Sequence, residues 1–480
     1  MLEVETRARS TTTGALSLLF LAALLVLMVM HACWLLFTGD AAYAAADLVL
    51  QLVSLVLFAV WSRSALGSFL NPPFMFISAI YFWHSTFLTG YYLSSGPMFQ
   101  FTGDVFNYGE EYVPQAVALV SLSMAGAIVG SVAGYLIPLR RATTRRLQAE
   151  RDVSPVAAWL FFGAILVISL AYLAEEGPKT FQNGYMFLYN EAPDTPIYRL
   201  WDATSYFGVL AILMVFQSAK SFKQYVIAGA MTMLLVFINL LFGTRSMPFI
   251  YALTLLVSID RFVRRIPFLA LVAIAVIASA ASFVIDHTRG SGLGLQILDF
   301  QRTGLSIDLF NIFWNAGNSV KTILRTMEFA GQSGLWWGRS FFDALLSLVP
   351  TPVWTTLGLS WNFVRPSMWL VDNSNDLPVG VGLGYSLVAE SYVNFGIIGF
   401  LIFIPIGWFL GRQFLKGERG RGHFGYLHAF NASVLLALHM RNDFQTYFRT
   451  IFWGIVIVEV LRSRILQRRA ESPVLVGEPA

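Results

Sequence analysis

Several arginines in this sequence stand at the edges of long apolar runs, where charged side chains are rare. Arg245 follows a Gly-Thr pair, Arg289 follows an Asp-His-Thr triplet, and two more arginines lie in the polar segment 439–449. The planar guanidinium group of arginine can bind two phosphate oxygens at once. We therefore predict that a diphosphate group is bound by four residues, Arg245, Arg289, Arg441 and Arg449.

Structural roles also fit these arginines. Arg245 fits equally well the role of an interfacial anchor, whose side chain reaches from a helix end to the membrane surface. Asp286 can pair with Arg289 and Asp443 with Arg441, in which case each aspartate is only a structural partner. The sequence leaves these alternatives open.

Acidic and imidazole side chains near the same apolar edges are candidates for proton transfer. Glu390 is a lone carboxylate among apolar neighbours, and Asp443 and His439 share one short segment with two arginines. A positioned carboxylate or imidazole can take a proton from a hydroxyl group in a transition state. We predict Glu390 as the catalytic base, with Asp443 or His439 as the next candidates. Glu390 could instead bind backbone amides at a helix end.

The apolar runs that must position these residues are long enough to cross a membrane. The chain has 480 residues, of which 56% are hydrophobic and 12% charged, and its mean hydropathy is +0.63. A membrane helix needs about 20 apolar residues. The sequence predicts an all-α integral membrane protein, residues 1–480 forming a single polytopic domain with about 12 transmembrane helices. The runs lie near 14–38, 46–62, 73–92, 115–138, 155–173, 203–219, 224–243, 247–260, 266–285, 393–411, 425–440 and 450–461.

Basic residues are concentrated in every second connector, beginning with Arg7 and Arg9 and ending with Arg468 and Arg469. Loops rich in Lys and Arg stay in the cytoplasm. We therefore expect a multi-pass membrane protein with both termini cytoplasmic. The isoelectric point near 9.1 then reflects the inner membrane surface, and no nucleic-acid partner is expected.

One large loop, 286–390, separates the ninth and tenth runs and falls on the predicted outer, periplasmic side. It carries several cations and six of the 13 tryptophans. Apolar residues are spaced among polar ones through 300–329 as in an amphipathic helix lying on a membrane. The segment 341–361 is apolar but contains Pro350 and Pro352, which suits a re-entrant or interfacial segment. Cations beside aromatic rings on the outer side suit a phosphate-bearing lipid that carries sugar.

Two further patterns concern packing and metals. Gly126, Gly130 and Gly134 repeat every fourth residue, which predicts close contact with another membrane helix. Cys33 is the single cysteine, so no cysteine metal site can form, and no plausible pair of aspartates for a metal is present. We expect neither a metal nor a cofactor.

These features together resemble the Wzy-type O-antigen polymerases, which join oligosaccharide repeat units. The resemblance rests on Arg245 after Gly-Thr, on 382–396 running into Ile-Ile-Gly-Phe, and on the segment around Arg441. It implies a GT-C-like, metal-independent glycosyltransferase of the bacterial plasma (inner) membrane. The implied substrates are undecaprenyl-diphosphate-linked oligosaccharides, as both donor and acceptor, and a chain-length regulator protein is a possible partner.

Two other classes share part of this pattern. An O-antigen ligase would use the same donor and pass the glycan to the lipid A core, with His287 or His439 as an essential residue. A polysaccharide or lipid transporter would place paired charges in the middle of its spans, whereas these charges lie near the outer rim. The sequence favours the polymerase, then the ligase, then the transporter.

Overall fold

The computed structural model describes residues 2–93, 110–137, 153–183, 195–242, 246–277, 316–349, 351–357, 363–374, 384–418, 424–440 and 442–471. Within these ranges the regular structure is helical and no β-strand occurs, which confirms the all-α prediction. The elements are α1 (Leu2–Thr38), α2 (Ala41–Leu66), α3 (Pro72–His84), α4 (Thr86–Leu93), η2 (Glu110–Tyr112), α5 (Val113–Leu136), α6 (Pro155–Asn183), α8 (Pro196–Ser205), α9 (Gly208–Ser218), α10 (Phe222–Leu241), α11 (Ser246–Ser258), η5 (Ile259–Val263), η8 (Ala316–Ser319), α15 (Val320–Ser333), α16 (Arg339–Leu346), α17 (Thr351–Thr356), α18 (Pro366–Asp372), α19 (Leu387–Phe395), η9 (Gly396–Ile402), α20 (Phe403–Glu418), α21 (Phe424–His439) and α22 (Phe444–Glu471).

Several helices begin at a residue whose side chain caps the first turn. The Asn71 side chain accepts a hydrogen bond from the Phe74 amide at 2.9 Å, and prolines fill the first turn of α3. Ser386 caps α19 in the same way, accepting from the amides of Val388 and Ala389. Such caps satisfy amide groups that have no partner inside the helix.

Eight helices in the described ranges are long and apolar enough to cross a membrane, or nine if the bent pair α8–α9 forms one span. Within the described residues, all 12 predicted runs fall on helical segments, but four of them are short, broken or only partly described. The run 73–92 divides into α3 and α4, and 203–219 divides into α8 and α9. α21 has 16 residues, and only Phe268–Ile277 of 266–285 is described as an apolar helix. The chain is therefore a multi-pass protein, and the number 12 stays a prediction.

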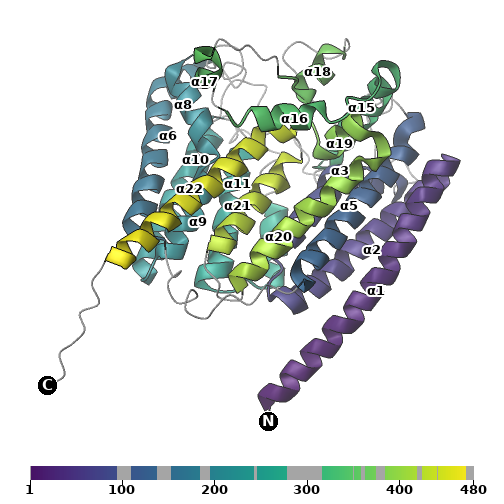
Figure 1. Ribbon diagram of the computed structural model, residues 1–480, viewed down its shortest axis with the longest axis horizontal. Coiled ribbons are helices and arrows are strands. Elements are labelled where there is room, and N and C mark those ends of the chain that lie inside the picture. Colours follow the sequence, from purple (N-terminus) through teal and green to yellow (C-terminus); the bar gives the residue numbers. More distant parts are fainter. Residues whose placement is uncertain are drawn as a thin grey trace, which may run out of the picture.

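The helices pack around two apolar clusters. The first joins α1, α2, α3 and α5 with α19 and α20. The second joins α6, α9, α10 and α11, and α21 contributes to both clusters. Figure 1 shows these helices side by side, with α15 to α18 gathered across one end and the start of α1 and the end of α22 at the other. We call the first the insert end.

The glycine repeat predicted as a packing face lies against α20. A Cβ atom on Gly130 would stand 2.0 Å from the Ile404 carbonyl oxygen, and one on Gly134 would stand 2.4 Å from that of Trp408. From the other side, Gly407 and Gly411 of α20 approach the backbone of α5 equally closely. The prediction is confirmed, because only glycine allows such backbone contact.

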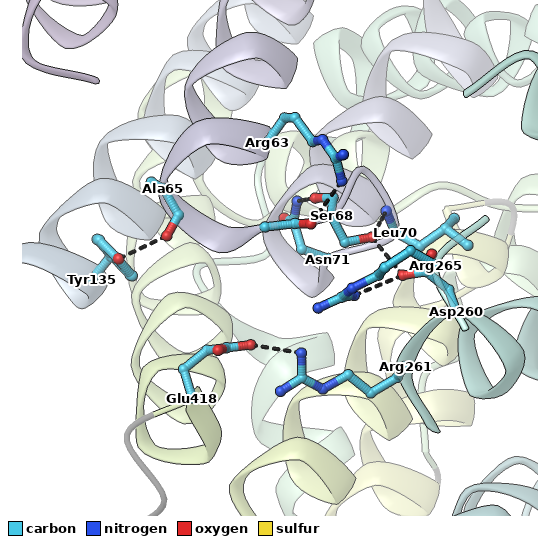
Figure 2. Close-up of polar contacts among 11 residues, drawn as sticks. Arg63, Ala65, Ser68, Leu70, Asn71, Tyr135, Asp260, Arg261, Arg265 and Glu418 are labelled. Carbon is cyan, nitrogen blue, oxygen red and sulfur yellow. Dashed lines mark hydrogen bonds and ion pairs between the residues drawn. The ribbon is translucent and has the colours of Figure 1, made fainter. Parts of the chain in front are cut away.

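The opposite end of the bundle is held by a buried carboxylate, and we call it the Asp260 end (Figure 2). Asp260 Oδ2 accepts hydrogen bonds from Ser68 Oγ at 2.6 Å and from Arg265 at 2.9 Å. Its Oδ1 accepts from the Ile266 amide at 2.8 Å. Ser68 belongs to the α2–α3 connection and Asp260 to η5, so this contact joins the two halves of the bundle.

Other arginines at the Asp260 end also have partners (Figure 2). Arg261 pairs with Glu418 at the end of α20 at 2.8 Å and lies over the Tyr426 ring at 4.0 Å. Arg63 donates to the Gly67 carbonyl oxygen at 2.7 Å. The cations named here are thus tied to acceptors of the protein itself.

A buried polar network crosses α1, α2, α5 and the α3–α4 junction. The Asp47 carboxylate accepts from Ser121 and lies 3.4 Å from His31. Gln51 donates to Ser121 at 2.7 Å and accepts from Ser85 at 2.5 Å. Polar groups within apolar surroundings need such partners, and this network fixes where α3 ends.

The described part of the predicted loop forms short helices. α15 is amphipathic, as predicted for 300–329, but its apolar side (Val320, Ile323, Leu324 and Met327) is buried in the first cluster and packs against α19. α16 and α17 contain eight and six residues. Neither could span a membrane. Residues 278–315 lie outside the described ranges, as do parts of 350–383.

Candidate functional site

Glu390 lies at the centre of the contacts that hold the insert end together. Its side chain is fully buried. One carboxylate oxygen accepts from Ser340 Oγ at 2.5 Å and the other from the Phe444 amide at 2.6 Å. Because Ser340 is on α16 and Phe444 begins α22, one carboxylate of α19 ties three helices.

The partners of Glu390 are themselves connected. The Asn394 amide group donates to Ser340 Oγ at 2.7 Å, and the Ser340 amide donates to Asn394 Oδ1 at 3.2 Å. Phe444 is the first residue of α22, so its amide is one of those without an intrahelical partner. A carboxylate there also interacts favourably with the helix dipole, by about 0.3–1 kcal/mol. Glu390 thus makes the contact that the sequence offered as its structural alternative.

Asp443 is the second buried carboxylate at this end and lies directly before Phe444. Its oxygens accept from Ser367 Oγ at 2.8 Å and from Thr446 Oγ1 at 2.5 Å. Its charge acts on both Glu390 and Tyr385. Two of the predicted catalytic residues, Glu390 and Asp443, are therefore neighbours in space, although they lie 53 positions apart in the sequence.

Asp343 is a third buried carboxylate, which sequence reasoning missed. It lies on α16 and its Oδ2 accepts from the Val364 amide at 2.8 Å. α16 packs against α22, so Asp343 and Asp443 belong to neighbouring helices. Asp343 sits in an apolar segment, FFDALL, and nothing local marks the distant amide that it binds.

Two arginines of this end differ from the carboxylates in being exposed, whereas Arg325 on α15 is buried. Arg449 on α22 and Arg365 before α18 are both solvent-exposed. Both lie within electrostatic range of Asp202, an exposed residue of α8. Among the described residues, neither guanidinium group makes a hydrogen bond or an ion pair. Two cations with open hydrogen-bonding groups thus converge near one carboxylate.

Four predicted site residues cannot be placed by their side chains. Arg245, Arg289 and Arg441 lie outside the described residues. His439 ends α21, close in sequence to Asp443, but its side chain is also outside the description. Of the seven predicted site residues, Glu390, Asp443 and Arg449 are therefore located, and all three belong to the insert end.

His84, at the end of α3, is a further buried residue that the sequence analysis did not single out. Its Nε2 lies 2.7 Å from Ser386 Oγ and its Nδ1 lies 2.8 Å from the Ile80 carbonyl oxygen. A carbonyl oxygen only accepts, so Nδ1 carries the proton and Nε2 accepts from Ser386 when the ring is neutral. His84 therefore orients the residue that caps α19, one turn before Glu390. A histidine inside an apolar run was the available signal.

Aromatic rings surround the insert helices. Trp336 and Trp369 meet edge to face at 4.9 Å, and Phe329 meets Trp369 at 6.1 Å. Trp337 is 77% exposed and has a φ of 53°. A non-glycine residue in that region is strained, and such strain is often found at functional sites. Trp337 is an exposed ring two positions before Arg339 in the sequence.

The comparison with protein families now decides the class. The family model described as O-antigen polysaccharide polymerase Wzy matches residues 18–468. The chain belongs to the O-antigen polysaccharide polymerase Wzy family. No curated protein and no solved structure matches it. This Wzy protein is thus a polymerase of oligosaccharide repeat units in polysaccharide biosynthesis, and the resemblance predicted from the sequence is confirmed.

Family membership also settles the setting of the reaction. The Wzy chain is a multi-pass bacterial membrane protein that acts on lipid-linked oligosaccharides. Within the described residues, no group of three or more His, Cys, Asp or Glu side chains is arranged to hold a metal ion.

Proposed function

We propose that this Wzy polymerase transfers a growing glycan from an undecaprenyl diphosphate carrier to a hydroxyl group of another lipid-linked repeat unit. The hydroxyl oxygen attacks the anomeric carbon of the donor, and the bond from that carbon to the diphosphate oxygen breaks. The lipid diphosphate leaves with the bonding electrons, and the proton of the hydroxyl passes to a base. Negative charge therefore develops on the diphosphate, which fixed cations can stabilise.

The observation that carries this proposal is the pair of exposed arginines at the insert end. Arg449 and Arg365 both lie within electrostatic range of the Asp202 carboxylate. Neither has a hydrogen-bonding partner among the described residues. In this proposal they bind the diphosphate in place of a metal ion, together with the predicted residues Arg245, Arg289 and Arg441. Arginine suits the task, because it stays charged and can bind two oxygens at once.

The base stays a prediction, with Glu390 first and Asp443 or His439 next. In the described conformation the carboxylates of Glu390 and Asp443 are buried and already accept two hydrogen bonds each. For either one to act as the base, an acceptor hydroxyl must replace one of these donors. Glu390 would have to release Ser340, because its other donor, the Phe444 amide, is fixed at a helix end.

The proposed orientation places the insert end on the periplasmic side of the inner membrane and both termini in the cytoplasm. It is supported by the basic connectors at the opposite end, which carry Arg63, Arg261, Arg264 and Arg265. A lipid-linked substrate would then reach the arginines from the outer leaflet. A chain-length regulator protein would contact the polymerase from the same side or within the membrane.

The first test is the surface glycan of a host strain that lacks this gene. We expect single repeat units only, and wild-type protein should restore a ladder of longer glycans. Arg449→Ala should fail to restore it, with polymerisation reduced by about 10²–10³-fold, as is typical when one stabilising donor is removed from an active site. Arg264→Ala is the matched control, since it removes an exposed arginine from the opposite end. It should restore the ladder.

Other outcomes would count against the proposal. Long polymer that remains on its lipid carrier and is absent from lipid A would indicate a ligase. An unchanged ladder in the deleted strain would show that another protein polymerises the glycan. A full ladder with Arg449→Ala would remove that arginine from the diphosphate site and leave the polymerase activity standing.

A further inference from the structure

The backbone around Arg365 is fastened on both sides by buried carboxylates. On one side the Val364 amide donates to Asp343 Oδ2 at 2.8 Å. On the other, Ser367 Oγ donates to Asp443 Oδ2 at 2.8 Å. The exposed Arg365 side chain lies between these two attachment points.

The two anchors are parts of packed helices, whereas Arg365 belongs to the insert. Asp343 is on α16, Asp443 directly precedes α22, and these helices contact each other. Both aspartate side chains are buried. A hydrogen bond to a charged acceptor is stronger than one between neutral groups, so each anchor holds the segment firmly. α18 alone, with seven residues, could not fix the position of a long side chain.

An arginine that is fixed before its ligand arrives loses less conformational entropy on binding. Immobilising a rotamer-rich side chain costs free energy, and fixing the backbone in advance reduces the total cost of ordering. Arg365 also lies, with Arg449, in the field of Asp202. The fastening therefore keeps one cation near a second cation that belongs to the rigid helix α22.

We propose that Asp343 is a positioning residue which, together with the Ser367–Asp443 contact, holds Arg365 beside Arg449 for binding the donor diphosphate. The proposal rests on the proposed function, because it takes its ligand from the lipid diphosphate donor. Asp343 touches neither the diphosphate nor the sugar. It acts through the Val364 amide, and its removal leaves the Arg365 guanidinium present but displaced.

A double-mutant cycle tests this role. Full-length protein in phosphatidylcholine nanodiscs is titrated with farnesyl diphosphate, and the affinity is measured by calorimetry. Arg365→Ala should weaken binding by about tenfold or more, the range expected for a hydrogen bond to a charged group. Asp343→Ala should cause a similar loss. The double variant should bind no more weakly than either single variant, because residues that act as a unit are not additive.

Two further variants separate positioning from general stability. Asp343→Asn keeps an oxygen that can accept from Val364, so its affinity should stay within about threefold of the wild type. Ser367→Ala should weaken binding, whereas Ser68→Ala should leave the affinity unchanged. Ser367 donates to the buried Asp443 at 2.8 Å, and Ser68 donates to the buried Asp260 at 2.6 Å. The two variants therefore remove equivalent hydrogen bonds at opposite ends of the protein.

The outcomes against the proposal are distinct. Additive losses in the cycle, or unchanged affinity with Arg365→Ala, would overturn the positioning role and leave the polymerase proposal intact. Wild-type protein that binds farnesyl diphosphate no better than farnesyl monophosphate would overturn the diphosphate donor, and the positioning role with it. If phosphatidylglycerol in the nanodisc displaced the probe as well as pyrophosphate does, the arginines would belong to a phospholipid headgroup site, which also contradicts the proposal.

Discussion

Buried carboxylates organise both ends of this molecule, but their partners differ. At the Asp260 end, Asp260 binds Arg265 and Glu418 binds Arg261, so cations neutralise the acids (Figure 2). At the insert end, Glu390 and Asp443 bind serine and threonine hydroxyls and a backbone amide. No described arginine of the insert end is paired with either of these two acids.

The difference bears on our proposal that Arg449 and Arg365 bind the diphosphate. An arginine held in an internal ion pair cannot bind an external anion without leaving its carboxylate, which is costly when that carboxylate is buried. Arg449 and Arg365 have no such bond to break among the described residues. Arg261 and Arg265 are therefore tied to acids of the protein itself, whereas Arg365 and Arg449 are exposed and make no ion pair within the described residues.

The largest stability change should come from breaking the Asp260 end. Asp260→Ala leaves Ser68, the Ile266 amide and Arg265 without their shared acceptor, and it should lower the free energy of unfolding by about 3–5 kcal/mol. Thermal denaturation in detergent measures this change. The protein that remains folded should still bind farnesyl diphosphate like the wild type. Weaker binding by this variant would mean that the two ends are not functionally separate.

A smaller loss of stability should follow at the insert end. Glu390→Ala leaves the Phe444 amide and Ser340 without their acceptor, at about 1–3 kcal/mol for each buried group left unsatisfied. Asn394 still contacts Ser340, so the lower part of that range applies to the serine. The matched variant Glu390→Gln keeps one acceptor oxygen and should be more stable than Glu390→Ala in the same denaturation assay.

Glu390→Gln also distinguishes two roles of Glu390, namely holding α16 and α22 in place and accepting a proton in the reaction. If Glu390 only holds α16 and α22, the glutamine variant should rebuild most of the glycan ladder. If Glu390 is the base, the ladder should be lost although the protein is folded. Equal stability of the alanine and glutamine variants would contradict the holding role.

The smallest effect should come from the partly exposed pair at the Asp260 end. Glu418→Gln removes the negative charge that pairs with Arg261. The Arg261 side chain is 16% exposed and that of Glu418 is 32% exposed. Such pairs contribute about 1 kcal/mol or less, and the stacking of Arg261 on Tyr426 remains. We expect a shift of a few degrees at most in thermal denaturation and an unchanged ladder. A loss of several kcal/mol would show that this pair behaves like a buried one.

Much of the fold follows from local patterns in the sequence. The described part of each apolar run is helical, because a polar backbone in lipid must satisfy its hydrogen bonds internally. The repeat Gly126, Gly130 and Gly134 identified the face on which α5 meets α20. The number of spans did not follow as simply, because α3, α8, α9 and α21 are too short to cross alone and hydropathy does not report where a helix breaks or bends.

The site was only partly predictable. Glu390 stood out because a single carboxylate lay in an apolar segment, and its structural alternative, binding a backbone amide, is a contact that the structure contains. Asp343 is also a single carboxylate in an apolar segment, and sequence reasoning passed it over. Its partner, the Val364 amide 21 positions away, is brought near only by tertiary packing. The same holds for Asp202 and the two arginines that act on it. Charge and hydropathy therefore predict a site at the insert end, whereas the pairing of its groups depends on the folded chain.

The contact between Ser68 and Asp260 has a mechanical consequence. It joins the α2–α3 connection to η5, and hence the two apolar clusters, at the end away from α16 and α18. The clusters also share α3, α20, α21 and α22, so they are held together along the bundle as well as at this contact. Ser68 and Asp260 are 192 positions apart, so their hydrogen bond closes a long loop of the chain that contains α3 to α11. A force that pulls the two segments apart at this end must first break that bond.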